Sequence, residues 1–297
     1  MGTGEPLRFW KGQALGNDYL VLRGSDDLAP GVVEGLCHRH LGVGGDGVLL
    51  GDPAREPAAL RIFNPDGGEA EKSGNGLRIF AAWLHHLGLV GTTPFRVTLP
   101  GEAVEMEVEG ASAGGVRTVR VDMGTASFRA GDVHFTGAPP EAEVIGAPLD
   151  VGGEEVGIHL VSLGNPHCVV FRDEPDRGLD RRDLVRLGPG LQSLPVFASG
   201  INVQLARVAT PDTLEALVWE RGAGETMASG SSACAVAAAA VRSGRVEPGL
   251  LRVVMPGGAL RVRIHDDWLV RLTGTAQIVY EGTVPGDVVT GWSRVDG

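Results

Sequence analysis

The sequence contains two copies of one pattern, and this pattern decides the fold. Residues 61–84 read RIFNPDGGEAEKSGNGLRIFAAWL, and residues 217–240 read LVWERGAGETMASGSSACAVAAAA, 156 positions later (217 − 61). Aligned without a gap, both copies carry a Gly-Glu pair and then a Ser-Gly pair that opens an apolar run. The serines of these pairs are Ser73 and Ser229.

A second pair of matching words lies upstream of each copy. LGND stands at 15–18 and LGNP at 163–166, which is 148 positions later (163 − 15). Two half-chains that carry the same two words in the same order indicate a duplicated fold. We therefore expect one functional site to which both copies contribute.

Hydrophobic periodicity predicts many strands and one long helix in each half. The helices are expected over Leu77–Leu89 and from Ser229 to about Ser243, where apolar residues recur at helical spacing and a glycine follows the second one. Strand-like runs with Gly-rich turns fill the rest of both halves, including one unbroken run over 156–171 and two separate runs at 268–274 and 276–282. This pattern predicts an α+β fold of two similar domains.

The segment 127–152 is rich in Gly, Ala and Pro and is the best candidate for the boundary between the halves. We expect an N-terminal domain over 1–127 and a C-terminal domain over 128–275. The last run, 276–297, has no counterpart in the plan of the first half, and it is expected to return to the N-terminal domain.

Composition limits the classes of function. The chain has 297 residues, of which 43% are hydrophobic and 21% charged, and this is the composition of a globular protein. A net charge of −11 without any basic stripe argues against nucleic acid as a partner. No apolar run approaches the roughly 20 residues of a membrane span. The three cysteines follow no disulfide or zinc pattern, so a cytoplasmic location is expected by default.

The two Ser-Gly turns are candidate anion sites. A Gly-rich turn that enters a helix leaves backbone N–H groups unpaired at the positive end of the helix dipole, where a carboxylate or phosphate can bind. The alternative is that Ser73 and Ser229 are ordinary N-caps, a role that serine fills well. Their occurrence as a pair, each behind an acidic and Gly-rich loop, favours a functional site.

The whole arrangement resembles the diaminopimelate epimerase family along nearly its full length. The resemblance rests on six ordered words: LGNDYLVL (15–22), LGVGGDGVLL (41–50), FNPDGGEAEKSGNGLR (63–78), LGNPHCVVF (163–171), GINVQLARV (200–208) and WERGAGETMASGSSACA (219–235). It implies two similar domains, each a mixed or antiparallel sheet wrapped around a central helix, with the substrate in the cleft between them. It also implies no cofactor, neither pyridoxal phosphate nor metal, and a pair of cysteines that remove and deliver the α-proton.

The sequence departs from the family pattern at those two cysteines, which are Ser73 and Ser229 here. A thiol titrates near roughly 8.5 and lower at a helix N-terminus, whereas a serine hydroxyl needs an adjacent base to act. Lys72 directly precedes Ser73, although neighbours in a chain usually point apart. By resemblance, His167 and Glu220 match positions that adjust the protonation of the two bases.

The resemblance also assigns the substrate-holding residues. Those that would grip the distal, unreactive end of the substrate are Asn64, Asn165, Asn202 and Arg221, with Glu220 beside them. Those that would donate to the reacting carboxylate are Gly74, Asn75, Gly230 and Ser231, and Asn17 would support the site from the first LGN word, although an isolated asparagine is as often a turn former.

Three functions remain open from the sequence. The first is a cofactor-independent epimerase that interconverts LL- and meso-diaminopimelate. The second is a racemase or isomerase for another polar amino acid. The third is a weak or silent paralogue that binds the ligand without turning it over. Each has a small amino acid as its partner, with neither nucleic acid nor membrane, and a homodimer stays open.

Overall fold

The computed structural model describes residues 4–25, 27–172 and 178–293, and its contacts divide the chain into two compact units. Unit 1 comprises Met1–Val121 and Gly274–Gly297, and unit 2 comprises Asp122–Thr273. The sequence placed the corresponding boundaries at 127/128 and 275/276. The Gly-, Ala- and Pro-rich segment that follows the first boundary contributes Ala130, Val133 and Phe135 to the core of unit 2.

The strands of unit 1 form a ring. Along the ring, β17 pairs with β1, β1 with β2, β2 with β3, β3 with β4, β4 with β6, β6 with β7 and β7 with β8, and β8 pairs with β17 again. The β2–β3 and β4–β6 pairs are parallel, so the sheet is mixed. The strands are β1 (Leu7–Ala14), β2 (Asn17–Arg23), β3 (Val48–Asp52), β4 (Ala58–Phe63), β5 (Glu69–Ala70), β6 (Phe95–Leu99), β7 (Glu102–Ala111), β8 (Val116–Thr125) and the C-terminal part of β17 (Leu269–Val284).

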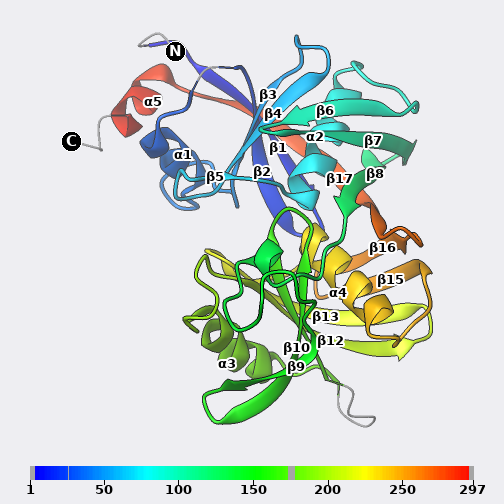
Figure 1. The fold of residues 1–297 in the computed structure, drawn as a ribbon. Helices are drawn as coiled ribbons and strands as arrows, with labels where there is room; N and C mark the ends of the chain where they lie inside the picture. Colours follow the sequence, from blue (N-terminus) through cyan, green and yellow to red (C-terminus); the bar gives the residue numbers. More distant parts are fainter. Residues whose placement is uncertain (1–3, 26, 173–177, 294–297) are drawn as a thin grey trace. The chain divides into compact units, whose positions relative to one another are not determined.

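Helix α2 (Gly74–His86) is the central helix of unit 1, and Figure 1 shows it among the strands of the ring. Every residue from Gly74 to Leu84 is buried, because strands cover the helix on all sides. Two glycines let these strands approach it: a Cβ on Gly12 would lie 2.3 Å from Ile79, and one on Gly51 would lie 2.3 Å from Phe80. The helix therefore depends on its wrapping for stability more than on its own propensity.

Unit 2 repeats this order of elements. Its strands are β9 (Ile145–Val151), β10 (Glu154–Ser162), β11 (Pro166–Phe171), β12 (Asn202–Thr210), β13 (Thr213–Glu220), β14 (Gly224–Thr226), β15 (Gly249–Met255), β16 (Gly258–Ile264) and the N-terminal part of β17. Helix α4 (Gly230–Arg242) takes the central place and is buried from Gly230 to Ala240. The register repeats as well, since Val48 pairs with Phe63 in unit 1 and Val203 with Trp219 in unit 2. The predicted duplication and α+β class are confirmed.

Three further helices were not predicted. Helix α1 (Pro30–Cys37) connects the parallel strands β2 and β3, and α3 (Arg181–Gln192) connects the parallel strands β11 and β12. Helix α5 (Gly286–Trp292) packs on α1, where Gly35 lies against Trp292 (Figure 1). Because two glycines and Pro189 interrupt α3, its sequence does not read as a helix, although Leu184, Leu187 and Leu191 form a buried face.

Three predicted element bounds were wrong. Helix α2 begins at Gly74 and not at Leu77, because burial inside the ring outweighs the low helix propensity of its glycines. The run 156–171 is interrupted between Ser162 and Pro166, where the LGN word forms a hairpin loop. The runs at 268–274 and 276–282 are instead one strand, β17, whose C-terminal part pairs with β1 from Gln277 to Val284.

The close approach of β1 to α2 gives a stability test. We expect Gly12→Ala to lower the free energy of unfolding by about 1–3 kcal/mol, because the added methyl overlaps Ile79 in a packed core. The matched control is Gly110→Ala in β7, where a Cβ would have nothing within 4 Å and should change stability by less than about 0.5 kcal/mol. Urea unfolding of both variants is the measurement. Equal stabilities would contradict the tight packing of α2.

Candidate functional site

The first LGN word is a tight hairpin that presents its asparagine. Leu15 and Gly16 have φ of 56° and 87°, and Ala14 pairs with Asn17, as in a two-residue hairpin turn with positive φ at both central positions. Alternation along β2 then places Asn17 and Tyr19 on the face that α2 covers. The hairpin therefore directs two polar side chains at the start of the central helix.

A chain of side-chain hydrogen bonds links that hairpin to α2. Asn75 Nδ2 donates to Asn17 Oδ1 at 2.9 Å, and Arg78 Nη2 donates to Asn75 Oδ1 at 2.8 Å. On the other side, Asn17 Nδ2 donates to Asp46 Oδ2 at 2.8 Å. Arg78 is fully buried, so this chain fixes the side chains of the first helical turn from both ends.

Charged side chains support the loop behind Asn17. Asp18 forms ion pairs with Lys11 and with Arg39, and Arg39 also bonds Asp46 at 2.6 Å. Burial by itself would raise the pKa of Asp18, but the bonds from Arg39 and Lys11 outweigh it and lower that pKa. The carboxylates in this cluster hold the hairpin and the loop at 44–47 together.

Ser73 is the N-cap of α2. Its Oγ accepts a hydrogen bond from the Gly76 backbone N–H at 3.0 Å, and the Tyr19 hydroxyl lies 3.4 Å from the same Oγ. Lys72, the neighbour considered as an activating group, directs its ammonium to Glu102 Oε2 at 3.0 Å. Tyr19 is thus a titratable side chain that the structure brings close to Ser73.

Unit 2 repeats the link between an LGN asparagine and a central helix. Asn165 Nδ2 donates to Ser231 Oγ at 3.3 Å, and Ser231 occupies the position in α4 that Asn75 occupies in α2. His167 Nε2 bonds Asn165 Oδ1 at 3.0 Å, and Gln204 Nε2 bonds His167 Nδ1 at 3.1 Å. Since an amide oxygen can only accept and an amide nitrogen can only donate, His167 is the neutral tautomer protonated on Nε2.

His167 stays neutral over a wide pH range. Its side chain is fully buried, and burial, with a smaller effect of the nearby Arg221 charge, lowers its pKa to about 3. Both ring nitrogens are engaged, one by Asn165 and one by Gln204. The geometry therefore gives His167 the role of holding Asn165 in place.

The residues expected at the distal end of a substrate fall into two groups. Asn202 lies beside His167 in the parallel β11–β12 pair, and its Oδ1 accepts the Arg221 backbone N–H at 2.9 Å. The Glu220 carboxylate accepts a bond from Thr226 Oγ1 at 2.7 Å. Asn64 belongs to unit 1, where it is exposed and closes the turn to Gly68 through its backbone. The structure thus groups Asn165, His167, Asn202, Arg221 and Ser231 within unit 2.

Ser229 differs from Ser73 in its contacts. Its side chain is buried, with 4% of its surface exposed, at the N-cap of α4. Within the described residues the Ser229 hydroxyl makes no capping bond to its own helix, whereas Ser73 does. The two serines hold the same position in the duplicated fold but are not equivalent chemically.

The cysteines do not replace the missing thiols. All three are buried. Burial raises the pKa of Cys37 to about 12 and the pKa of Cys168 further still, so neither forms a thiolate near neutral pH. Cys234 is fully buried inside α4, at the position of Arg78 in α2.

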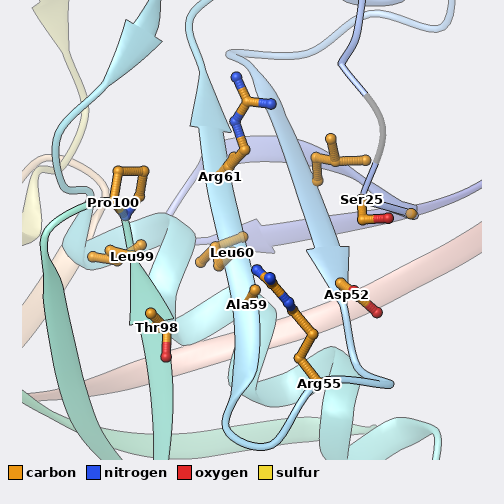
Figure 2. Close-up of a pocket in the computed structure, with 11 residues that line it drawn as sticks. Ser25, Asp52, Arg55, Ala59, Leu60, Arg61, Thr98, Leu99 and Pro100 are labelled. Carbon is orange, nitrogen blue, oxygen red and sulfur yellow. The ribbon is translucent and has the colours of Figure 1, made fainter.

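A pocket of about 310 Å³ lies elsewhere in unit 1 (Figure 2). It is lined mainly by β3, β4 and β6 residues such as Leu60, Thr98 and Leu99, with Asp52, Arg55 and Arg61 at its sides. None of the predicted site residues lines it. Among the described residues we find no helix that could cross a membrane, and no group of three acidic, histidine or cysteine side chains gathered for a metal.

Comparison with known proteins gives the family. The model of the family described as diaminopimelate epimerase matches residues 9–129 and 159–279, one match in each half. The chain is 39% identical to "Diaminopimelate epimerase 2" of a Nostoc species over 287 residues, covering 95% of this chain and 97% of that protein. It is 42% identical to the diaminopimelate epimerase of a Synechococcus species, with 93% and 98% covered.

The chain belongs to the diaminopimelate epimerase family. It is therefore an isomerase, as its resemblance implied. Solved structures agree in fold: a hydroxyproline epimerase from Agrobacterium vitis has a TM-score of 0.69 at 16% identity, covering 98% of this chain and 95% of that one. A predicted epimerase from Pseudomonas aeruginosa has a TM-score of 0.66 at 22% identity, with 94% and 99% covered.

Sequence reasoning missed several residues that organise these sites. Tyr19 contacts Ser73, Asp46 and Arg78 fix the Asn17–Asn75 pair, and Gln204 fixes His167. One signal was present in the sequence. Tyr19 and His167 each stand two residues after the asparagine of an LGN motif, and they are 148 positions apart (167 − 19). Asp46 and Gln204 have partners on distant parts of the chain, and no local pattern marks them.

The neutral state of His167 predicts a pH dependence of stability. An unfolded chain binds a proton on this histidine near pH 6.5, whereas the folded chain does so only near pH 3. Stability is therefore fully present above pH 6.5 and falls by up to about 1.4 kcal/mol per pH unit as the pH drops between these values. Urea unfolding at pH 6.5 and pH 5 measures the change.

The matched variant is His167→Gln, which keeps a buried amide that does not titrate. We expect the wild type to lose about 1.6 kcal/mol more than this variant between pH 6.5 and pH 5. The same loss in both proteins would show that His167 is protonated in the folded state and would contradict its buried, neutral assignment.

Proposed function

We propose that this chain is a cofactor-independent epimerase that interconverts LL- and meso-diaminopimelate, in the cytoplasmic synthesis of lysine and peptidoglycan precursors. Its curated relatives with 39% and 42% identity, matched over nearly their whole length, carry the name of this activity. The observation that carries the proposal is the repeated contact between an LGN asparagine and the first turn of a buried central helix. This contact occurs as Asn17–Asn75 in unit 1 and as Asn165–Ser231 in unit 2.

The chemistry expected of such helix starts is the binding of an anion. The first turn of a helix presents backbone N–H groups and the positive end of the dipole, and both favour a carboxylate. When an α-proton leaves an amino acid, negative charge builds on that same carboxylate. Donors already fixed in place stabilise this charge most, because they need not reorganise during the reaction. The proposed donors are Gly74, Asn75, Gly230 and Ser231.

Ser73 and Ser229 are the proposed proton-transfer residues, one for each face of the α-carbon. A neutral hydroxyl cannot accept the α-proton and keep its own, so each serine must pass its proton to a neighbour. Proton transfer is then expected to be slower than with a thiolate. This proposal includes the expectation, drawn from the sequence, that both serines reach the same substrate carbon.

The distal end of the substrate is assigned to unit 2 and to Asn64. A guanidinium can bind a carboxylate through two parallel hydrogen bonds, and amides can serve an amino group and a carboxylate at once. The proposed residues are Asn64, Asn165, Asn202, Glu220 and Arg221. The hydrogen bond from the Arg221 backbone to Asn202 supports this grouping, because it ties two of these residues together.

Two other functions remain if either the proposed distal clamp or the proposed proton transfer by the serines is wrong. A racemase or isomerase for another polar amino acid would keep the helix starts and use a different distal clamp. A silent paralogue would bind the ligand without exchange, because both thiols of the family are serines here. These alternatives differ from the main proposal in binding and in hydrogen exchange, so one experiment separates the three.

The test is incubation of the protein with LL-diaminopimelate in heavy water. We expect deuterium at the α-carbon together with the meso product, followed by NMR or mass spectrometry, and we expect Ser73→Ala and Ser229→Ala each to lower the rate at least a hundredfold. Tight binding without exchange would instead favour the silent paralogue. Neither binding nor exchange would remove diaminopimelate as the substrate.

Replacing both serines by cysteine tests their role from the opposite direction. We expect Ser73→Cys combined with Ser229→Cys to raise the exchange rate at least tenfold, because a thiol at a helix N-terminus ionises near neutral pH. The matched control is Ser243→Cys, at the far end of α4, which should leave the rate unchanged. An active serine enzyme that cysteine slows would contradict the proposed roles of the two positions.

A further inference from the structure

We propose that Tyr19 is the positioning residue for Ser73, and that it exchanges a proton with the serine hydroxyl during the reaction. This inference rests on the proposed function. Tyr19 Oη lies 3.4 Å from Ser73 Oγ, longer than a usual O–H···O bond. Such bonds at active sites often tighten only when substrate binds. The phenol belongs to β2 and the serine to the start of α2, 54 positions later.

Strand pairing and packing orient the Tyr19 ring toward Ser73. Tyr19 pairs with Gly12 across the β1–β2 hairpin, on the face where Gly12 admits Ile79 of α2. Gly47 gives the ring room, since a Cβ there would lie 2.6 Å from Tyr19 Cε1. Only 7% of the tyrosine is exposed. The ring is thus buried against Gly47, and its hydroxyl lies beside Ser73.

The hydrogen bonds around Ser73 leave its hydroxyl proton available for donation. Its Oγ already accepts the Gly76 N–H, so the hydroxyl proton is free to be donated. The Tyr19 oxygen is an acceptor of suitable kind at that position. A phenol titrates near roughly 10, far closer to neutral pH than an aliphatic hydroxyl, and can therefore hold or release the proton that serine cannot.

The Ser73 hydroxyl and the Tyr19 phenol together account for every proton in the proposed step. When Ser73 protonates the α-carbon, its O–H bond breaks as the C–H bond forms, and the Tyr19 O–H gives its proton to Ser73, which leaves a phenolate. In the reverse direction Ser73 takes the α-proton while its own proton passes to the Tyr19 phenolate. The serine is neutral before and after each step, and the negative charge passes between the phenol oxygen and the deprotonated substrate.

Unit 2 shows that this arrangement belongs to one half only. The position equivalent to Tyr19 is His167, whose ring nitrogens bond Asn165 and Gln204. The Ser229 hydroxyl makes no capping bond to its helix within the described residues. Tyr19 is therefore a specific addition on the Ser73 side of the duplicated fold.

The test compares Tyr19→Phe with Tyr280→Phe. The chain has only these two tyrosines, and Tyr280 is 47% exposed, so the second variant is a matched control. In heavy-water exchange with diaminopimelate we expect Tyr19→Phe to lower kcat at least tenfold with KM within about twofold, and Tyr280→Phe to leave both unchanged. The wild-type rate should rise with pH through a phenol ionisation, and this rise should be lost in Tyr19→Phe.

A cysteine background separates proton exchange from a merely structural role. Since a thiol ionises by itself, Tyr19→Phe should cost less than about threefold when Ser73→Cys is present. An equal loss in the serine and cysteine backgrounds would overturn the proposal, because it would mean that the tyrosine hydroxyl only supports the fold. A Tyr19→Phe rate within about twofold of the wild type would overturn it as well.

A readout without substrate distinguishes this proposal from the proposed function. In Tyr280→Phe, phenolate absorbance reports Tyr19 alone, and its titration midpoint should shift by at least about half a pH unit when Ser73→Ala is added. If no diaminopimelate exchange occurs but the midpoint shifts, the substrate assignment fails and the Tyr19–Ser73 pair stands. An unchanged midpoint overturns the pair.

Discussion

Burying a whole helix inside a sheet obliges the structure to deal with the first turn of that helix. Four backbone N–H groups at a helix start have no partner within the helix, and water cannot serve them freely in a packed interior. In α2 the Ser73 hydroxyl serves one of them, at Gly76. The proposed function assigns a substrate carboxylate to this turn. The site, the Ser-Gly words and the supporting asparagines all follow from this constraint.

The duplication kept the framework and changed the chemistry of its two copies. The pairing of Val48 with Phe63 and of Val203 with Trp219 shows how closely the backbones agree. Yet a buried Arg78 stands one turn inside α2 where α4 has Cys234, and the side chain behind each LGN word is a phenol in one unit and a neutral imidazole in the other. Unit 1 thus places a titratable phenol beside Ser73, whereas the equivalent position in unit 2 is a buried, neutral His167.

The sequence predicted those parts of the fold that depend on short motifs of neighbouring residues. The Ser-Gly words and LGN words predicted the duplication, because each marks a backbone turn that needs particular residues. It could not predict that α2 begins at Gly74, since only burial makes glycine acceptable there. Helix α3 was missed because Gly188 and Pro189 argue against a helix, while Gly188 is required by the close approach of Trp219. The Tyr19–Ser73 contact joins β2 to the start of α2 across 54 positions of sequence, and no local motif encodes it.

The proposed function requires that the starts of α2 and α4 bind the same amino-acid carboxylate. Backbone amide NMR of the Ser73→Ala variant, which should bind substrate without consuming it, tests this claim most directly. On titration with meso-diaminopimelate we expect the amides of Gly74, Asn75, Gly230 and Ser231 to shift together, with one dissociation constant and one ligand per chain. Shifts at only one helix start, or shifts confined to the pocket beside Arg61, would contradict it.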